Sequence, residues 1–306
     1  MLHALVQLRT RSDLEQYFEV LGIPEQLGAT LRPSLATLYF LANKHVMAIP
    51  YQNFDLFAKK DIDLSIEGIK RRLLGQKQGG MCYETSELLF YALETLGFQV
   101  KRIPVFPLNN QPFNPDMPST HNILIVSIEE KHFLVDVGYG YNSLRYPLEL
   151  RFEPLQEMNM LANEYYQLIR TNEYYQLNLN IKNHWFSLYR FSISLQPIDK
   201  QQTDENCRML LSLPPIVPVR DTYIKIGRLT NDGRIGFHYE PGHLTMLPYK
   251  LSIIGIEESR VEYQNAAILK EEIRREIGIE MPDALLREHD PIRAAEPGIA
   301  MCAHRP

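Results

Sequence analysis

The hydrophobic pattern of this 306-residue chain changes near Gly97, and that change restricts the folds the chain can adopt. Up to Gly97, apolar residues recur every three or four positions, which is the period of an amphipathic helix. Beyond Gly97, short β-branched and aromatic runs at 100–106, 123–128 and 133–137 are typical of strands. The pattern therefore predicts a helical part followed by a part built of strands.

Four helices are expected in the first part. The first closes at Gly22, and the second repeats the apolar spacing until Pro50 ends it. Ser65 can cap the third, because its hydroxyl can accept a hydrogen bond from a backbone N–H of the first turn. The fourth helix is predicted over residues 82–96 and carries an apolar stripe.

The rest of the chain contains a short repeat and a mixed segment. Residues 163–168 read Asn-Glu-Tyr-Tyr-Gln-Leu, and residues 172–177 repeat the same six letters. Two copies are too few for a solenoid, so we interpret them as the two arms of a β-hairpin. Further on, strands are predicted at 223–226 and 235–237 and a charged amphipathic helix at 266–277.

The charge balance excludes some classes of function. The chain has 32 Lys and Arg against 37 Asp and Glu, a formal net charge of −5, whereas proteins that grip nucleic acid or anionic membranes need clustered cations. No stretch approaches the roughly 18 consecutive apolar residues of a spanning helix. The histidines lack the spacing of metal ligands. We therefore expect no metal, no nucleic-acid partner, no membrane and, by default, a cytoplasmic location.

The chain has three cysteines, Cys82, Cys207 and Cys302, which are too few and too far apart for a disulfide framework. Their odd number fits a reducing compartment. Cys207 lies in a polar run, where no chemical neighbours are expected, and Cys302 lies in the last segment. Cys82 is therefore the thiol to consider for chemistry.

Cys82 follows two glycines and is expected to begin a helix. The partial positive charge of a helix N-terminus favours a thiolate there. Lowering a thiol pKa by three units corresponds to roughly 4 kcal/mol, and a helix end supplies at most about 1–2 kcal/mol. A cationic partner is therefore needed.

His121 and Asp136 are the candidates for that partner and for an acid that orients it. His121 stands at the entrance to one predicted strand, and Asp136 lies in the next, in an apolar run where an unpaired charge is costly. If the two strands pair as a hairpin, both residues lie near its open end. A Cys, a His and an acid that are distant in sequence are what a nucleophilic thiol site requires.

These residues and their spacing resemble the arylamine N-acetyltransferase family. Its signature, Arg-Gly-Gly-x-Cys-x-Glu-x-Asn, corresponds to Gln-Gly-Gly-Met-Cys-Tyr-Glu-Thr-Ser at 78–86. The separations of 39 residues from Cys82 to His121 and 15 from His121 to Asp136 are those of the family. Residues 135–140 match the family's Val-Asp-x-Gly-aromatic-Gly element, and the likeness is strong over 45–140.

The resemblance implies an α+β fold with a core like that of papain-type cysteine proteases. It would consist of a helical domain carrying the nucleophile at 1–97, a β-barrel domain carrying the His and Asp at 98–200 and an α/β lid at 201–287. Residues 288–306 are expected to be a flexible tail. The predicted order of helices, strands and a mixed segment agrees with this fold.

The resemblance also implies a Cys82–His121–Asp136 triad and a two-step acetyl transfer. Acetyl-CoA would be a co-substrate, with no permanently bound cofactor, and a small aromatic amine or hydrazine would accept the acetyl group. Phe106 and Tyr139 are candidate substrate contacts, and the residues that contact CoA stay unassigned. We expect a monomer or a weak homo-oligomer.

The chain departs from the family pattern at three places. The signature Arg is Gln78 and the Glu of an upstream segment is Gln52, so an amide pair is expected to replace a charged bridge. Ser86 replaces an Asn and has less hydrogen-bonding reach. Residues 214–217 read Pro-Pro-Ile-Val where the family has Ser and Phe near the CoA cleft. Two alternatives to the N-acetyltransferase remain open: another Cys-His-Asp acyl-transfer or amide-forming enzyme, and a catalytically impaired ligand-binding homologue.

Overall fold

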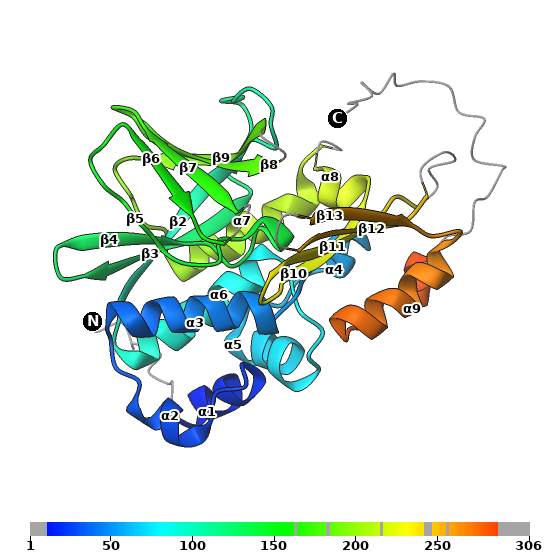
Figure 1. Cartoon of the computed structure of the whole chain (residues 1–306), viewed down its shortest axis with the longest axis horizontal. Helices are drawn as coiled ribbons and strands as arrows, with labels where there is room; N and C mark the ends of the chain where they lie inside the picture. The colour runs from blue at the N-terminus through cyan, green and yellow to red at the C-terminus, as the bar shows by residue number, and fades with distance from the viewer. Residues whose placement is uncertain are drawn as a thin grey trace.

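The structure is a computed structural model that describes residues 11–161, 164–181, 184–214, 217–241, 247–254 and 257–286. A helical part lies against one face of a large curled sheet, and a smaller sheet stands beside them (Figure 1). The α+β fold predicted from the sequence is confirmed. Within the described residues no helix is both long and apolar enough to cross a membrane.

The helical part follows the predicted pattern closely. Ser34 caps α3 and Ser65 caps α5, because each hydroxyl accepts a backbone N–H of the first turn. Gly97 ends α6 in the left-handed conformation that glycine favours, with φ of 95°. The helices are α1 (Arg11–Val20), α2 (Glu25–Thr30), α3 (Leu35–Ala48), α4 (Phe54–Phe57), α5 (Ile66–Ile69), the π-helical turn η1 (Lys70–Gly75) and α6 (Cys82–Leu96).

The large sheet has eight antiparallel strands in the order β5-β4-β3-β2-β9-β8-β7-β6. Within the described residues β5 and β6 are not paired with each other, so the sheet is an open half-barrel. Its strands are β2 (Gln99–Pro107), β3 (His121–Ile128), β4 (Lys131–Val135), β5 (Leu148–Glu149), β6 (Leu155–Asn159), β7 (Tyr165–Arg170), β8 (Tyr174–Ile181) and β9 (His184–Ser192). The repeat forms the predicted hairpin of β7 and β8, with Leu168 opposite Leu177.

Side-chain alternation along β3 gives the large sheet two apolar faces. Leu124 and Val126 pack against the helices, whereas Ile123 and Ile125 face the inside of the curl. The helix α6, which begins at Cys82, therefore lies directly on the sheet that carries His121.

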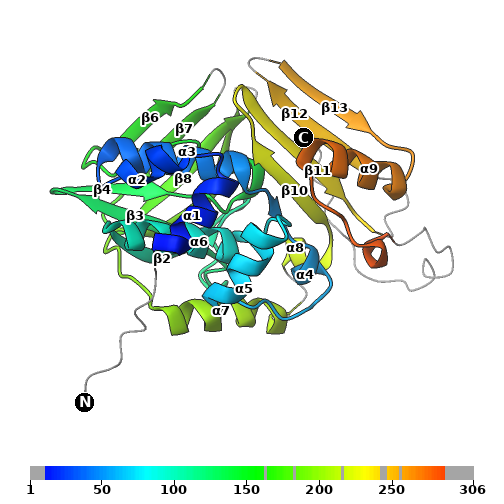
Figure 2. The ribbon, with the colours of Figure 1, turned by 90° about the horizontal axis from the view of Figure 1, so that it is seen from below.

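The smaller sheet has the order β1-β10-β11-β12-β13 and is entirely antiparallel. Its strands are β1 (Tyr51–Gln52), β10 (Ile224–Leu229), β11 (Gly233–Tyr239), β12 (Tyr249–Ile254) and β13 (Glu257–Glu262). The helix α9 (Ala266–Ile277) covers one face of this sheet (Figure 2) and buries Leu269 and Ile273 against it. The bounds predicted for this helix are confirmed.

The helix α7 (Lys200–Ser212), which is followed by the short α8 (Pro218–Asp221), was not predicted from the sequence. The side chain of Asp199 accepts the N–H of Gln202, whose own side chain accepts the N–H of Asp199. This capping box is a sequence-level signal of a helix start. Thr203, Cys207 and Leu210 form the buried stripe of α7.

The domain division at residues 97, 200 and 287 remains a prediction. One observation complicates it, because β1 comes from the first part of the chain yet forms the edge of the smaller sheet, pairing with β10. The tail predicted at 288–306 lies outside the described residues.

A buried cluster of charges joins the large sheet to the smaller one. Arg145 donates two hydrogen bonds to the carboxylate of Glu164, at 2.9 and 2.7 Å, and Arg234 of β11 lies 3.2 Å from the same carboxylate. Arg145 also donates to the backbone oxygens of Thr230, in the turn after β10, and of Gly233, the first residue of β11. One carboxylate thus holds two arginines at the junction of the sheets.

Candidate active site

A cavity of about 140 Å³ opens where α6, the start of β3 and the edge of the smaller sheet meet. Cys82, His121 and Tyr139 line it together with Tyr51, Tyr223 and Lys225. A short apolar wall from the α7–α8 region, including Leu210 and Val217, completes it. The cavity therefore draws its walls from all three predicted parts of the chain.

Cys82 is held in place by two close backbone approaches. Gly79 has φ of 66°, and a Cβ there would lie 2.2 Å from the carbonyl oxygen of Pro50, so the turn before the helix requires glycine. A Cβ on Gly138 would lie 2.8 Å from the Cα of Cys82. The segment after Asp136 therefore packs directly on the nucleophile candidate.

His121 and Asp136 are paired as expected for a base and its orienting acid. The Nε2 atom of His121 lies 3.1 Å from each carboxylate oxygen of Asp136, and both side chains are buried. The N–H of Gly138 donates to the same carboxylate at 3.0 Å, which fixes its orientation. Within the described residues Nδ1 of His121 has no hydrogen-bond partner, so this nitrogen is left for the cavity.

The rings of Tyr139 and Tyr189 pack against the imidazole of His121 and against each other, with 5.3 Å between the two tyrosine centroids. Their centroids lie 5.1 and 5.7 Å from that of His121, and Tyr139 meets it edge to face. The hydroxyl of Tyr139 donates to the backbone oxygen of Leu188 at 2.8 Å. The ring of Tyr139 is thus held by its hydroxyl at one end and by its contact with the imidazole.

The helix start favours a Cys82 thiolate only weakly, which agrees with the expectation that a cationic partner is also needed. Burial raises the pKa of Cys82 well above its usual range, and Cys207 and Asp136 add to the effect, while the N–H of Tyr83 lowers the pKa. The helix end is too weak to offset desolvation. A thiolate here needs a cation formed beside it, and an imidazolium on His121 is the candidate.

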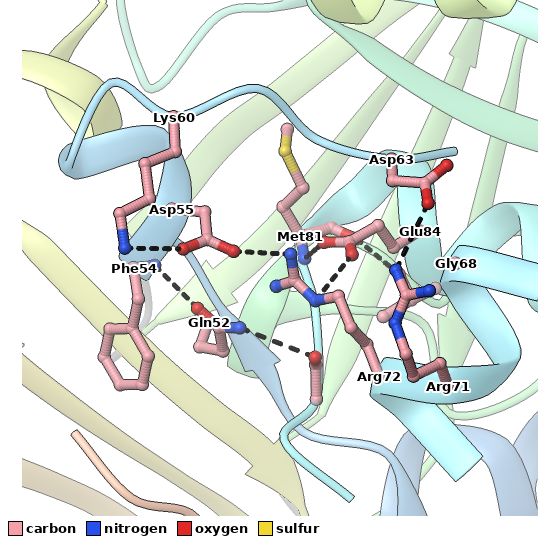
Figure 3. Close-up of polar contacts among 12 residues, drawn as sticks. Gln52, Phe54, Asp55, Lys60, Asp63, Gly68, Arg71, Arg72, Met81 and Glu84 are labelled. Atoms are coloured by element: carbon pink, nitrogen blue, oxygen red, sulfur yellow. Dashed lines mark hydrogen bonds and ion pairs between the residues drawn. The ribbon is translucent and has the colours of Figure 1, made fainter. Parts of the chain in front are cut away.

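The expected Gln52–Gln78 amide pair is wrong. The amide of Gln52 donates to the backbone oxygen of Gly79 at 3.5 Å and accepts the N–H of Phe54 at 2.6 Å (Figure 3). Within the described residues the structure contains no hydrogen bond between Gln52 and Gln78. The side-chain amide of Gln52 instead forms its hydrogen bonds with backbone groups of the glycine turn and of α4.

A charged bridge is nevertheless present at this place, supplied by Arg72 of η1. Its guanidinium lies 2.5 Å from a carboxylate oxygen of Asp55 and 3.2 Å from one of Glu84 (Figure 3). Glu84 also accepts the N–H of Met81 at 3.0 Å, and so ties the first turn of α6 to this network. Burial raises the pKa of Glu84 to about 7, and Arg72 opposes the rise.

Three further predictions can be placed. Ser86 reaches the backbone oxygen of Asn122 at 3.3 Å, next to His121. Tyr139 lines the cavity, but Phe106 is not among the described lining residues and packs edge to face on Phe113. A side chain on this strand faces one of two sides, and the side that Phe106 takes is set by the register with β3 and β9, which the sequence does not show.

The prediction that Cys207 has no chemical neighbours is wrong. It is buried on α7 in one apolar cluster with Cys82, Met81 and Leu210. Burial raises the pKa of Cys207 to about 12. The polar residues around Cys207 in the sequence lie on the solvent-exposed face of α7. Cys207 lies on the buried face, and the two sets can be told apart only by their helical spacing.

The sequence and the fold are both similar to those of known proteins. The sequence profile of the N-acetyltransferase family matches residues 34–280. The chain belongs to the arylamine N-acetyltransferase family. It is 33% identical over 189 residues to an arylamine N-acetyltransferase of Mycolicibacterium smegmatis, an alignment that covers 60% of this chain and 66%, just under two thirds, of that relative.

Solved structures of the family share the fold. A structure of the M. smegmatis arylamine N-acetyltransferase superposes with a TM-score of 0.72 at 26% identity, covering 91% of this chain and 96% of that one. The Mycobacterium marinum arylamine N-acetyltransferase in complex with CoA gives a TM-score of 0.73 at 22% identity, covering 92% and 97%. Family membership therefore agrees with the helices, half-barrel and second sheet described above.

Proposed function

We propose that this protein is an acetyl-CoA-dependent arylamine or arylhydrazine N-acetyltransferase that works through an acetyl-Cys82 thioester. The observation that carries the proposal is the buried His121–Asp136 pair, whose His121 lines the same cavity as Cys82. Family membership supports it, as does the CoA complex of the M. marinum relative.

In the first step the proton of the Cys82 thiol passes to Nδ1 of His121, and the sulfur attacks the acetyl carbonyl of acetyl-CoA. The bond between that carbonyl and the CoA sulfur breaks, and CoA takes the proton from His121 as it leaves as a thiol. Asp136 holds the proton on Nε2, so that Nδ1 is free to act as base, and it stabilises the imidazolium. In this step Cys82 and His121 are uncharged at the start and again at the end.

In the second step the nitrogen of the amine or hydrazine attacks the thioester carbonyl. The new C–N bond forms, the C–S bond breaks, and the proton lost by the nitrogen passes through His121 to the sulfur. Tyr139 is proposed to pack on the aromatic ring of the acceptor, because it lines the cavity beside the imidazole. The candidate contact at Phe106 has no such support.

The proposal includes a cytoplasmic enzyme that is a monomer or weak homo-oligomer, since a nucleophilic thiol must remain reduced. Its test is steady-state kinetics with acetyl-CoA and an aromatic amine. Parallel double-reciprocal lines and full loss of turnover in Cys82→Ala support it, with Cys207→Ala as the matched control that removes the other buried thiol. Turnover that survives Cys82→Ala contradicts it.

A further inference from the structure

Lys225 is a cation without an acidic partner in the wall of the cavity. On β10 its neighbours Ile224 and Ile226 face the core under α9, so the strand turns Lys225 to the opposite face. There it lines the same cavity as Cys82 and His121. Within the described residues its ammonium forms neither an ion pair nor a hydrogen bond.

The structure makes room for this side chain in the wall of the cavity. Gly140 has φ of 69°, and a Cβ there would lie 3.3 Å from Cε of Lys225. The Nζ atom lies 4.6 Å from the ring centroid of Tyr141 and 5.9 Å from that of Tyr139. Cation–π contacts hold the ammonium in position, but they do not neutralise its charge.

The charge of Lys225 is unbalanced in its surroundings. The described lining of the cavity contains no Asp or Glu and no second Lys or Arg. Burial lowers the pKa of Lys225 to about 8, so the group remains mostly protonated at pH 7. A partly buried cation without a counter-ion is costly, and an anion that enters the cavity supplies the missing charge.

We propose that Lys225 determines specificity by binding a carboxylate on one of the two substrates. The proposal rests on the proposed acyl transfer at Cys82. The carboxylate is either a ring substituent of the acceptor, as in an aminobenzoate, or the far end of the transferred acyl group, as in a malonyl thioester. In both cases a small carboxylate enters the cavity while another atom of the same substrate, the amine nitrogen or the acyl carbonyl carbon, reacts at Cys82.

The test compares substrate pairs on one preparation of each variant. The acceptors are 4-aminobenzoate and its neutral analogue 4-aminobenzamide with acetyl-CoA, and the donors are malonyl-CoA and acetyl-CoA with 4-aminobenzamide. Wild type is compared with Lys225→Met and with Lys101→Met, an exposed lysine on β2 that controls for net charge. The ratio of kcat/KM within each pair is independent of the folded fraction.

Lys225→Met is expected to lower one ratio, carboxylate over neutral, by about tenfold or more, as is typical for loss of a hydrogen bond to a charged group. A fall in the acceptor ratio places the carboxylate on the amine, and a fall in the donor ratio places it on the acyl group. Lys101→Met should leave both ratios unchanged. Unchanged ratios in Lys225→Met overturn the proposal.

Two controls distinguish a carboxylate subsite from a contact with CoA and from a protein that does not transfer acyl groups. If Lys225→Met weakens use of acetyl-CoA but not of acetylpantetheine, which lacks the nucleotide phosphates, the lysine serves CoA and the carboxylate proposal is overturned. If wild type shows no transfer, the proposed function fails. Calorimetric binding of 4-aminobenzoate against 4-aminobenzamide to wild type and Lys225→Met then decides the role of Lys225 alone.

Discussion

Both carboxylate oxygens of Asp136 lie 3.1 Å from Nε2 of His121, in a buried pair at the open end of the β3–β4 hairpin. Nε2 therefore contacts the acid, and Nδ1 remains available to groups that enter the cavity. Because the N–H of Gly138 holds the same carboxylate, the orientation of the pair is fixed by backbone. The proposed proton transfer from Cys82 depends on this arrangement.

Asp136→Asn should reduce turnover by about 10³–10⁴-fold while the protein remains folded. The amide can present an N–H to Nε2, which favours the tautomer with its proton on Nδ1 and removes the base for Cys82. Single-turnover acetylation by acetyl-CoA measures the effect, and Asp232→Asn, an exposed acid in the β10–β11 turn, is the matched control. Acetylation of Asp136→Asn at the wild-type rate contradicts the assigned role.

At pH 8, where Glu84 with its pKa of about 7 is ionised in the wild type, Arg72→Met should cost about 3–5 kcal/mol of the free energy of unfolding. The change leaves the carboxylates of Asp55 and Glu84 without their shared cation, and Glu84 is buried. Urea denaturation measures it. The neighbouring Arg71 is exposed and pairs with Asp63 at 3.2 Å, so Arg71→Met should cost less than about 1 kcal/mol. Equal losses in the two variants refute the buried bridge.

Glu84 should make stability fall as the pH rises from about 4.5 to 7. Burial raises its pKa from 4.5 to about 7, so in this range the folded protein keeps a proton that the unfolded chain has lost. Its contribution is fully present below pH 4.5 and is lost above about pH 7. The difference is roughly 3 kcal/mol at 1.36 kcal/mol per pKa unit.

The measurement is the urea unfolding free energy of wild type and Glu84→Gln across that pH range. Wild type should lose stability relative to the variant as the pH rises. The exposed Glu130→Gln serves as control and should run parallel to wild type. If Glu84→Gln also runs parallel to wild type, the raised pKa is disproved.

Glu164→Gln should cost about 3–5 kcal/mol, because it removes the charge that Arg145 and Arg234 share at the junction of the two sheets. Thermal or urea unfolding measures the loss. Glu157→Gln on the exposed side of β6 is the matched control, and its effect should stay within about 0.5 kcal/mol. A loss at Glu164 no larger than at Glu157 excludes a structural role for this cluster.

The parts of the fold that were predictable from sequence depend on local signals. The helix over 82–96, the β7–β8 hairpin and the helix over 266–277 follow from hydrophobic period, glycine stops and a repeat, all of which lie within a few residues. The same holds for α7, whose capping box at Asp199 and Gln202 was present in the sequence but was missed.

The site was only partly predictable. The residues Cys82, His121 and Asp136 could be selected by spacing, and the structure brings the last two into contact. The hydrogen-bond partners of Gln52 and the bridge made by Arg72 could not be predicted from the sequence. They depend on which backbone groups and turns come together in the folded chain. Lys225 was detectable as a lysine between two isoleucines, but only the fold shows that its face of β10 lines the cavity.

The most direct test of the central claim is the intact mass of the protein after incubation with acetyl-CoA alone. The account predicts one acetyl group, located on Cys82 by peptide mapping, absent in Cys82→Ala, retained in Cys207→Ala and discharged when an aromatic amine or hydrazine is added. A folded wild-type protein that gains no acetyl group on Cys82, or one whose acetyl group does not transfer to any amine or hydrazine, contradicts it.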